Sequence, residues 1–180
     1  MNSFRAGLAL FIERWGLVDS KFRQNKLRYL LQAGLATLTM MVVLLLLDEV
    51  EQTVLIASLG ASAFIAFAMP RSYPSRPRYM IGGYCVGSAV GCLLSVLAGL
   101  LADQLGGHLR AVQIICGAVA IGLSFFLMVV TDTEHPPAAA LALGYVLNEW
   151  QLDTVLVVLG GVTALAAIKQ LFRARLMDLV

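Results

Sequence analysis

Residues 118–147 read AVAIGLSFFLMVVTDTEHPPAAALALGYVL, an apolar run that a polar, proline-containing cluster interrupts before it resumes. Proline lacks an amide hydrogen and favours the first position of a helix, so Pro136 and Pro137 predict that a new helix begins there. The dozen or so residues from Pro136 reach about 18 Å as a helix, less than the ~30 Å of bilayer hydrocarbon. The stretch therefore predicts a membrane segment too short to cross alone, preceded by extended backbone.

The composition of the whole chain indicates an integral membrane protein. Of its 180 residues, 59% are hydrophobic and only 13% are charged, and the mean hydropathy is +0.83. Soluble domains carry about 25% charged residues. No polar stretch is long enough for a separate soluble domain. We therefore expect a single transmembrane domain over residues 27–180, preceded by a cytoplasmic, amphipathic segment over residues 1–26 that lies on membrane lipids.

The apolar runs differ in length, and the difference predicts the architecture. Four are long enough to cross as helices, whereas two are shorter, and the first of the short ones contains the weakly helical sequence SLGAS at residues 58–62. We expect an all-α, polytopic transmembrane helix bundle of six membrane segments, two of them short or discontinuous. Two triplets of segments would then form a 3+3 inverted repeat, which in transporters places a substrate site near the bilayer midplane. The long runs cover residues 27–47, 79–102, 111–131 and 154–172, and the short ones residues 52–70 and 136–147.

Charged residues predict the topology, because basic residues favour the cytoplasmic side of a membrane. If all six segments cross, the basic N-terminal region, the loop RSYPSRPR at residues 71–78 and the C-terminal tail with Lys169 share one side, and the opposite side is mainly acidic. This predicts a multi-pass protein of the cell inner (plasma) membrane with both termini in the cytoplasm. A four-span alternative would put the acidic DEVE of residues 48–51 and the basic loop in one external connection, so it ranks second.

Small residues recur on two of the predicted helices. Such faces let helix backbones approach closely, either within the bundle or between protomers, so a homo-oligomer is expected. The first face consists of Gly83, Gly87, Gly91, Ser95 and Gly99, and the second of Gly160, Gly161, Ala164 and Ala167.

The sequence predicts an anion site at two helix starts, because free amide groups and the positive end of the helix dipole attract anions there. Hydroxyl and imidazole groups beside them would complete the site, although they also have an ordinary structural role between membrane helices. No spacing of cysteines or histidines indicates a metal, and no cofactor is expected. The predicted substrate-binding residues are Thr131, Thr133, His135, Pro136, Pro137 and Ala138 at one start and Ser58, Gly60, Ala61 and Ser62 at the other. Candidates for proton coupling are Asp132, Glu134 and His135, and Arg71, Arg76 and Arg78 are candidates for a cytoplasmic vestibule.

Three ordered motifs carry a family resemblance. SLGASAFIAFAMP at residues 58–70, a Pro-Arg pair followed by Gly82 and Gly83, and TDTEHPPAAA at residues 131–140 together resemble the HPP family of integral membrane proteins, over a core of about residues 55–143. The resemblance implies a small-anion permease, because members of that family have been linked to nitrite transport in cyanobacteria and chloroplasts. Family members are expected to carry a histidine where this chain has Tyr84, so a relay of two histidines is not expected here.

Other function classes have weaker support in the sequence. There is no phosphate-binding loop, HExxH motif or nucleophile elbow, so neither an enzyme nor a nucleic-acid-binding protein is expected. The main alternative is a membrane scaffold or sensor module that transports nothing. A further alternative is a proton- or cation-conducting protein that uses the carboxylates and the histidine of TDTEH.

Overall fold

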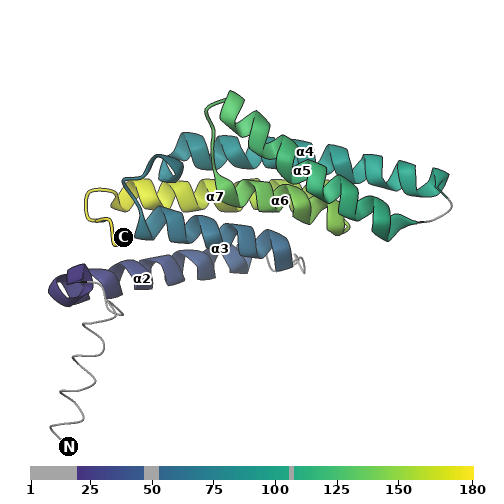
Figure 1. Cartoon of the computed structure of the whole chain (residues 1–180). Helices are drawn as coiled ribbons and strands as arrows, with labels where there is room; N and C mark the ends of the chain where they lie inside the picture. Colours follow the sequence, from purple (N-terminus) through teal and green to yellow (C-terminus); the bar gives the residue numbers. More distant parts are fainter. Residues whose placement is uncertain (1–19, 47–52, 106–107) are drawn as a thin grey trace, which may run out of the picture.

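The computed structural model describes residues 20–46, 53–105 and 108–180, and within these ranges it contains helices and no strand (Figure 1). The expected all-α bundle is thereby confirmed. Most of the predicted interfacial segment, residues 1–26, lies outside the described residues. The helices are α2 (Ser20–Leu46), α3 (Thr53–Ala68), α4 (Pro77–Gln104), α5 (Leu109–Val130), α6 (Pro136–Leu147) and α7 (Leu152–Phe172), and a 3-10 turn, η1 (Tyr73–Ser75), connects α3 to α4.

The helices divide into long and short ones as the sequence predicts. Among the described helices, α2, α4, α5 and α7 are long and apolar enough to cross a membrane, whereas α3 and α6 have 16 and 12 residues. At 1.5 Å per residue the two short helices reach about 24 and 18 Å. All six predicted membrane segments are therefore present as helices, and the two expected to be short are short.

The short helix α3 is continuous, so the break predicted at residues 58–62 is wrong. Helical structure runs through Gly60 without interruption. The Ser58 hydroxyl donates to the Leu55 carbonyl at 2.7 Å, and the Ser62 hydroxyl lies 3.0 Å from the Ser58 carbonyl. Ser58 thus finds its partner inside the helix and Ser62 lies within reach of one, so neither serine requires a new helix start.

The triplets α2–α3–α4 and α5–α6–α7 are arranged as an inverted repeat. In Figure 1 each helix runs antiparallel to its counterpart in the other triplet. The contacts between helices follow the same correspondence, in which α2, α3 and α4 are the counterparts of α5, α6 and α7. When each helix is replaced by its counterpart, the contact α2–α3 becomes α5–α6, α4–α5 becomes α7–α2, and α4–α6 becomes α7–α3. The contacts α3–α6 and α4–α7 are unchanged by this replacement. The two short helices α3 and α6 thus meet at the centre of the repeat.

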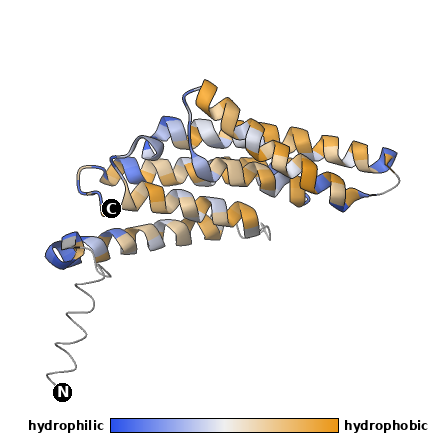
Figure 2. Ribbon diagram, viewed as in Figure 1, coloured by the Kyte–Doolittle hydropathy of each residue, from blue (hydrophilic) through white to orange (hydrophobic). Residues whose placement is uncertain are grey.

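Two apolar clusters hold the bundle together. The larger joins α3, α4, α6 and α7, and the smaller lies between α4, α5 and α6. Large apolar side chains such as Leu45, Phe126 and Leu171 are exposed on the outside, and Figure 2 shows apolar helix surfaces with hydrophilic residues gathered at the ends. An apolar exterior is what a helix bundle presents to lipid, where helices associate by close packing and not by escape from water.

The small-residue face of α4 packs inside the chain, against α6 and the connection before it. A Cβ added at Gly87 would run into the carbonyl oxygen of Ala138, and one at Gly91 would lie 2.8 Å from the Cα of Ala142. At Gly99, by contrast, no atom lies within 4 Å of such a Cβ. Most of this face therefore serves packing within the bundle rather than contact between protomers.

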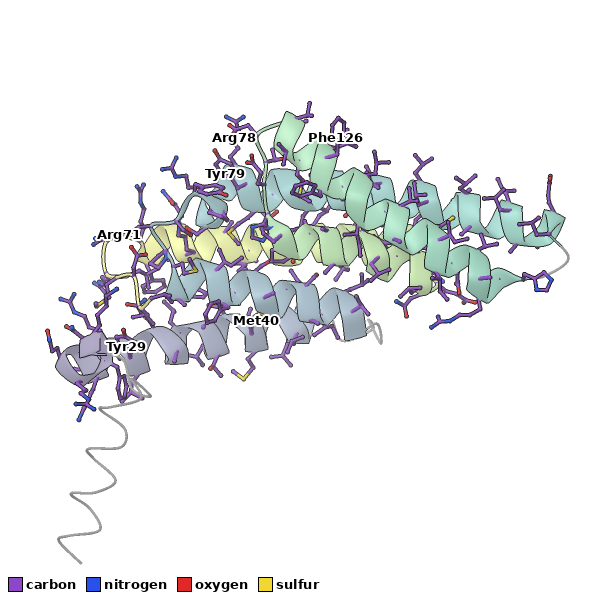
Figure 3. The ribbon with its side chains drawn as sticks, in the orientation of Figure 1. Tyr29, Met40, Arg71, Arg78, Tyr79 and Phe126 are labelled. Carbon is purple, nitrogen blue, oxygen red and sulfur yellow. The ribbon has the colours of Figure 1, made fainter. Side chains whose placement is uncertain are left out.

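One end of the bundle collects basic residues and both described chain ends. The start of α2, the turn η1 and the C-terminus lie at this end in Figure 1, and Figure 3 labels Arg71 and Arg78 there. The Lys21 ammonium donates to the Val180 carbonyl at 3.0 Å, which ties α2 to the C-terminal residue. We refer to it as the basic end, and its residues include Lys21, Arg28, Arg71, Arg76, Arg78 and Arg173.

Candidate functional site

The connection between α5 and α6 folds back into the bundle because Asp132 adopts a left-handed conformation. Its φ is 53°, which aspartate tolerates better than most residues. The amide of Thr133 then donates to the Met128 carbonyl at 2.9 Å and ends α5. His135 follows with extended backbone, and Pro136 begins α6 as the sequence predicts. The turn thereby directs the histidine side chain inward.

His135 is fully buried and both of its ring nitrogens have partners. Nδ1 lies 3.0 Å from the carbonyl oxygen of Pro74, in turn η1, and Nε2 lies 2.8 Å from the Ser62 hydroxyl of α3. A carbonyl can only accept, so Nδ1 carries the hydrogen, and in the neutral ring Nε2 accepts from Ser62. His135 therefore links the start of α6 to η1 and to α3.

The Ser62 hydroxyl continues this hydrogen-bonded chain to Tyr84 of α4. The Tyr84 hydroxyl lies 2.9 Å from Ser62 Oγ and 3.2 Å from Ser58 Oγ, and its ring centroid is 5.7 Å from that of His135. All four side chains are buried. We call Ser58, Ser62, Tyr84 and His135 the polar cluster.

Two adjacent glycines of α4 make room for the connection that carries His135. A Cβ at Gly83 would lie 2.7 Å from the Cβ of His135, and one at Gly82 would lie 2.6 Å from the Cγ2 of Thr133. Any larger residue would push the connection away from α4. The Gly-Gly pair and the TDTEHPP stretch, noted separately in the sequence, are therefore the two sides of one contact.

The prediction that backbone amides at the start of α6 form an anion cradle is wrong for this structure. Pro136 and Pro137 have no N–H to offer, and the amide of Ala138 donates to the His135 carbonyl at 2.9 Å. The second predicted helix start, at residues 58–62, lies in the middle of α3. The donors that converge here are side-chain hydroxyls and not free amides.

The structure separates several other predicted residues from the polar cluster. Gly60 and Ala61 are exposed on α3, and Gly60 lines an apolar groove between α2 and α3 of about 900 Å³. Thr131 is exposed, with its hydroxyl 2.8 Å from that of Thr133. Glu134 is half-buried.

Asp132 forms an ion pair at the surface of the basic end. Its carboxylate lies 2.9 Å from the Arg78 guanidinium, with both side chains more than half exposed, and it accepts a hydrogen bond from the Tyr79 hydroxyl at 3.0 Å. Figure 3 shows Arg78 and Tyr79 beside each other on α4. The other vestibule candidates, Arg71 and Arg76, are exposed as well. The three arginines thus share one end of the molecule.

Lys169 is buried, although its place in the sequence predicts a residue of the C-terminal tail. It lies inside α7, is 1% exposed, and donates to the carbonyl of Ser75 at 3.0 Å and to its hydroxyl at 3.2 Å. Ser75 follows Pro74, the partner of His135, so turn η1 contacts both buried basic side chains. The signal in the sequence was spacing, because Lys169 continues the buried face that Val158, Val162 and Leu165 begin.

Within the described residues, three buried hydroxyls have no hydrogen-bond partner, namely those of Ser88, Ser124 and Tyr145. Also within these ranges, no group of three or more His, Cys, Asp or Glu side chains could hold a metal ion. The polar cluster is therefore built of three hydroxyls and one imidazole.

Comparison with known proteins identifies the family. The family description "HPP, transmembrane region" matches residues 22–177, which is nearly the whole described chain and extends well beyond the predicted core of residues 55–143. The chain belongs to the HPP transmembrane family. No solved structure matches it.

The HPP protein also resembles two curated transmembrane proteins of Dictyostelium discoideum. One is 34% identical over 95 residues, which is 53% of this chain, and the other is 31% identical over 103 residues, which is 57% of it. The matched part covers 30% of the length of each relative. Both are named only as transmembrane proteins, so they support the membrane class and no particular activity.

Proposed function

We propose that this HPP protein is a membrane permease for a small inorganic anion, with nitrite as the first candidate. The observation that carries the proposal is the place of the polar cluster. Ser58 and Ser62 come from α3 and His135 begins α6, and these two short helices are counterparts in the inverted repeat and contact each other. Transporters built from inverted repeats bind their substrates where such short or broken segments meet.

The chemistry of the polar cluster suits a small polar solute. Buried polar residues are costly in a membrane bundle and usually mark a solute pathway. The hydroxyls of Ser58, Ser62 and Tyr84 can donate to an anion. The Ser62 hydroxyl can also turn from His135 to the Ser58 carbonyl, 3.0 Å away, which would let Nε2 of His135 take up a proton. This arrangement supports His135 as the proton-coupling residue in preference to Asp132, which is paired with Arg78 at the surface.

The charge distribution supports the proposed orientation in the cell inner membrane. The basic end carries Arg71, Arg76 and Arg78, and basic residues favour the cytoplasm, so both termini are assigned to that side. An anion would enter from the cytoplasm past these arginines. A homo-oligomer would use the face of α7 on which Gly160 and Ala167 are exposed, since the α4 face is occupied by α6.

Uptake of nitrite into proteoliposomes tests the proposal. Purified protein is compared with His135→Ala and with the matched control His108→Ala, since His108 is exposed at the other end of the bundle, before α5. Nitrate, formate and chloride serve as competitors, an imposed pH gradient is the variable, and protein-free vesicles give the leak of nitrous acid. We expect saturable uptake that His135→Ala lowers at least about tenfold and His108→Ala leaves unchanged.

The same assay separates the competing functions. Absence of flux above the protein-free control for every anion would overturn the permease and favour the scaffold or sensor. Flux of protons or cations without anions would favour the conducting alternative, although its carboxylate Asp132 lies at the surface and outside the polar cluster.

A further inference from the structure

Lys169 is a buried cation that neither the predicted mechanism nor the polar cluster uses. Its side chain is 1% exposed and points into the bundle from α7, three residues before that helix ends. A lysine this close to a helix end can usually reach water along the membrane surface. Lys169 instead stays inside, where its ammonium donates to the carbonyl and hydroxyl oxygens of Ser75.

Both partners of the Lys169 ammonium are neutral oxygen atoms. Among the described residues, no carboxylate oxygen lies within 4 Å of Nζ. The neighbouring charged groups are Arg76 and Arg173, both cationic, and Asp178, whose carboxylate accepts a hydrogen bond from the backbone amide of Arg71 at 3.0 Å. A buried charge normally has an opposite charge beside it. Within the described part of the chain, Lys169 has no carboxylate in direct contact.

With His135 neutral, as its two hydrogen bonds require here, the proposed anion site in turn lacks a positive charge. Both ring nitrogens of His135 are hydrogen-bonded, one to Ser62 and one to Pro74. The first N–H group of α6, that of Ala138, donates to the His135 carbonyl. Hydroxyl groups alone do not neutralise an anion taken out of water. Turn η1 links this site to a buried cation, because the Pro74 carbonyl accepts from His135 and the carbonyl of the next residue, Ser75, accepts from Lys169.

We propose that Lys169 is the cationic anchor for a small monovalent anion, and that turn η1 is the gate that covers it. In the arrangement seen here the two oxygens of Ser75 occupy two of the three N–H donors of the ammonium. When η1 moves, it releases Lys169 and His135 together, and the anion replaces the Ser75 oxygens. The inference rests on the proposed function, because it assigns a binding residue to the same permease.

The substitution Lys169→Gln tests the anchor, since glutamine keeps a hydrogen-bonding group for Ser75 but removes the charge. The matched control is Arg173→Gln, which removes an exposed cation four residues further along. The full-length protein is reconstituted, and nitrite uptake is measured against concentration. Lys169→Gln is expected to raise the half-saturation concentration about tenfold or more, the effect of losing a charged hydrogen bond. Arg173→Gln is expected to change it by less than about threefold, as for a screened surface charge.

A second variant keeps the test decisive if Lys169→Gln does not fold. Ser75→Ala removes one of the two oxygens that occupy the ammonium, so it is expected to lower the half-saturation concentration while also lowering thermal stability. If Lys169 has a purely structural role, Ser75→Ala lowers stability and leaves the half-saturation concentration unchanged. That result would overturn the anchor.

The outcomes for the two proposals differ. Wild-type protein without saturable uptake of nitrite, nitrate, formate or chloride would overturn the permease, and the anchor with it. Saturable wild-type uptake combined with an unchanged half-saturation concentration in folded Lys169→Gln would overturn the anchor alone.

Discussion

At the scale of single residues, two fully buried tyrosines differ in their hydrogen bonding. The Tyr84 hydroxyl contacts Ser62 and Ser58, whereas the Tyr145 hydroxyl has no partner among the described residues. Burial of a polar group without a partner costs about 1–3 kcal/mol, and a satisfied hydrogen bond contributes about 1 kcal/mol. The same chemical change at the two positions should therefore have opposite effects.

Tyr145→Phe is expected to leave the stability of the protein unchanged or to raise it by up to about 2 kcal/mol, because it removes an orphaned hydroxyl. Tyr84→Phe is expected to lower stability by about 1 kcal/mol, because Ser58 and Ser62 lose a partner. Thermal unfolding of both variants in the same detergent gives the comparison. A loss of stability in Tyr145→Phe equal to that in Tyr84→Phe would show that the Tyr145 hydroxyl is bonded after all, either to the neighbouring Ser88 hydroxyl or to a buried water.

At the scale of elements, the contact between α4 and α6 depends on where the glycines of α4 lie. A methyl group at Gly87 would strike the backbone of Ala138, whereas one at Gly99 would meet open space. Gly87→Ala is expected to destabilise the protein by about 1–3 kcal/mol through overpacking. Gly99→Ala is expected to be neutral or to stabilise by about 0.5–1 kcal/mol, because alanine favours helix. Thermal unfolding of the two variants in the same detergent measures both changes in stability. Equal changes would contradict the packing described here.

The end of α5 depends on the left-handed backbone conformation of Asp132 rather than on the charge of its side chain. Its ion pair with Arg78 is largely exposed, and such pairs contribute less than about 1 kcal/mol. Asparagine tolerates a positive φ, so Asp132→Asn is expected to lower the stability by less than about 1 kcal/mol. Valine is β-branched and does not, so Asp132→Val is expected to lower the stability by at least about 1–2 kcal/mol. Thermal unfolding measures both. A larger loss for the asparagine variant would show that the charge matters more than the backbone.

The sequence predicted the elements better than it predicted the site. Segment lengths follow from hydropathy and from Pro136, which are local signals, and all six helices were anticipated. The continuity of α3 was missed because a serine next to a glycine can either cap a break or bond the preceding turn, and only the packed structure distinguishes the two. Tyr84 and Lys169 were missed because their partners lie 22 and 94 residues away in the chain.

At the scale of the whole molecule, contacts at the basic end favour six crossings over the four-span alternative. That alternative places the loop after α3 and the C-terminal tail on opposite sides of the membrane. Here the Arg71 amide donates to Asp178 at 3.0 Å, and the Leu179 amide donates to the Ala68 carbonyl at 2.8 Å. Because these hydrogen bonds join the two segments at one end of the bundle, we expect α3 to return the chain to the side on which α2 began.

Labelling of single cysteines tests this topology in cells. At some positions the two arrangements place the residue on opposite sides of the membrane, and at others they place it on the same side. In a background without Cys85, Cys92 and Cys116, the six-crossing arrangement places Arg76→Cys inside and Asp103→Cys outside, and the four-span arrangement reverses both. Arg175→Cys and Asp153→Cys serve as controls, since both arrangements put them inside and outside, respectively. With a membrane-impermeant maleimide on intact cells, we expect labelling at positions 103 and 153 and, only after permeabilisation, at 76 and 175. Labelling of position 76 on intact cells with none at 103 would contradict the inverted repeat and, with it, the meeting of α3 and α6 on which the proposed site depends.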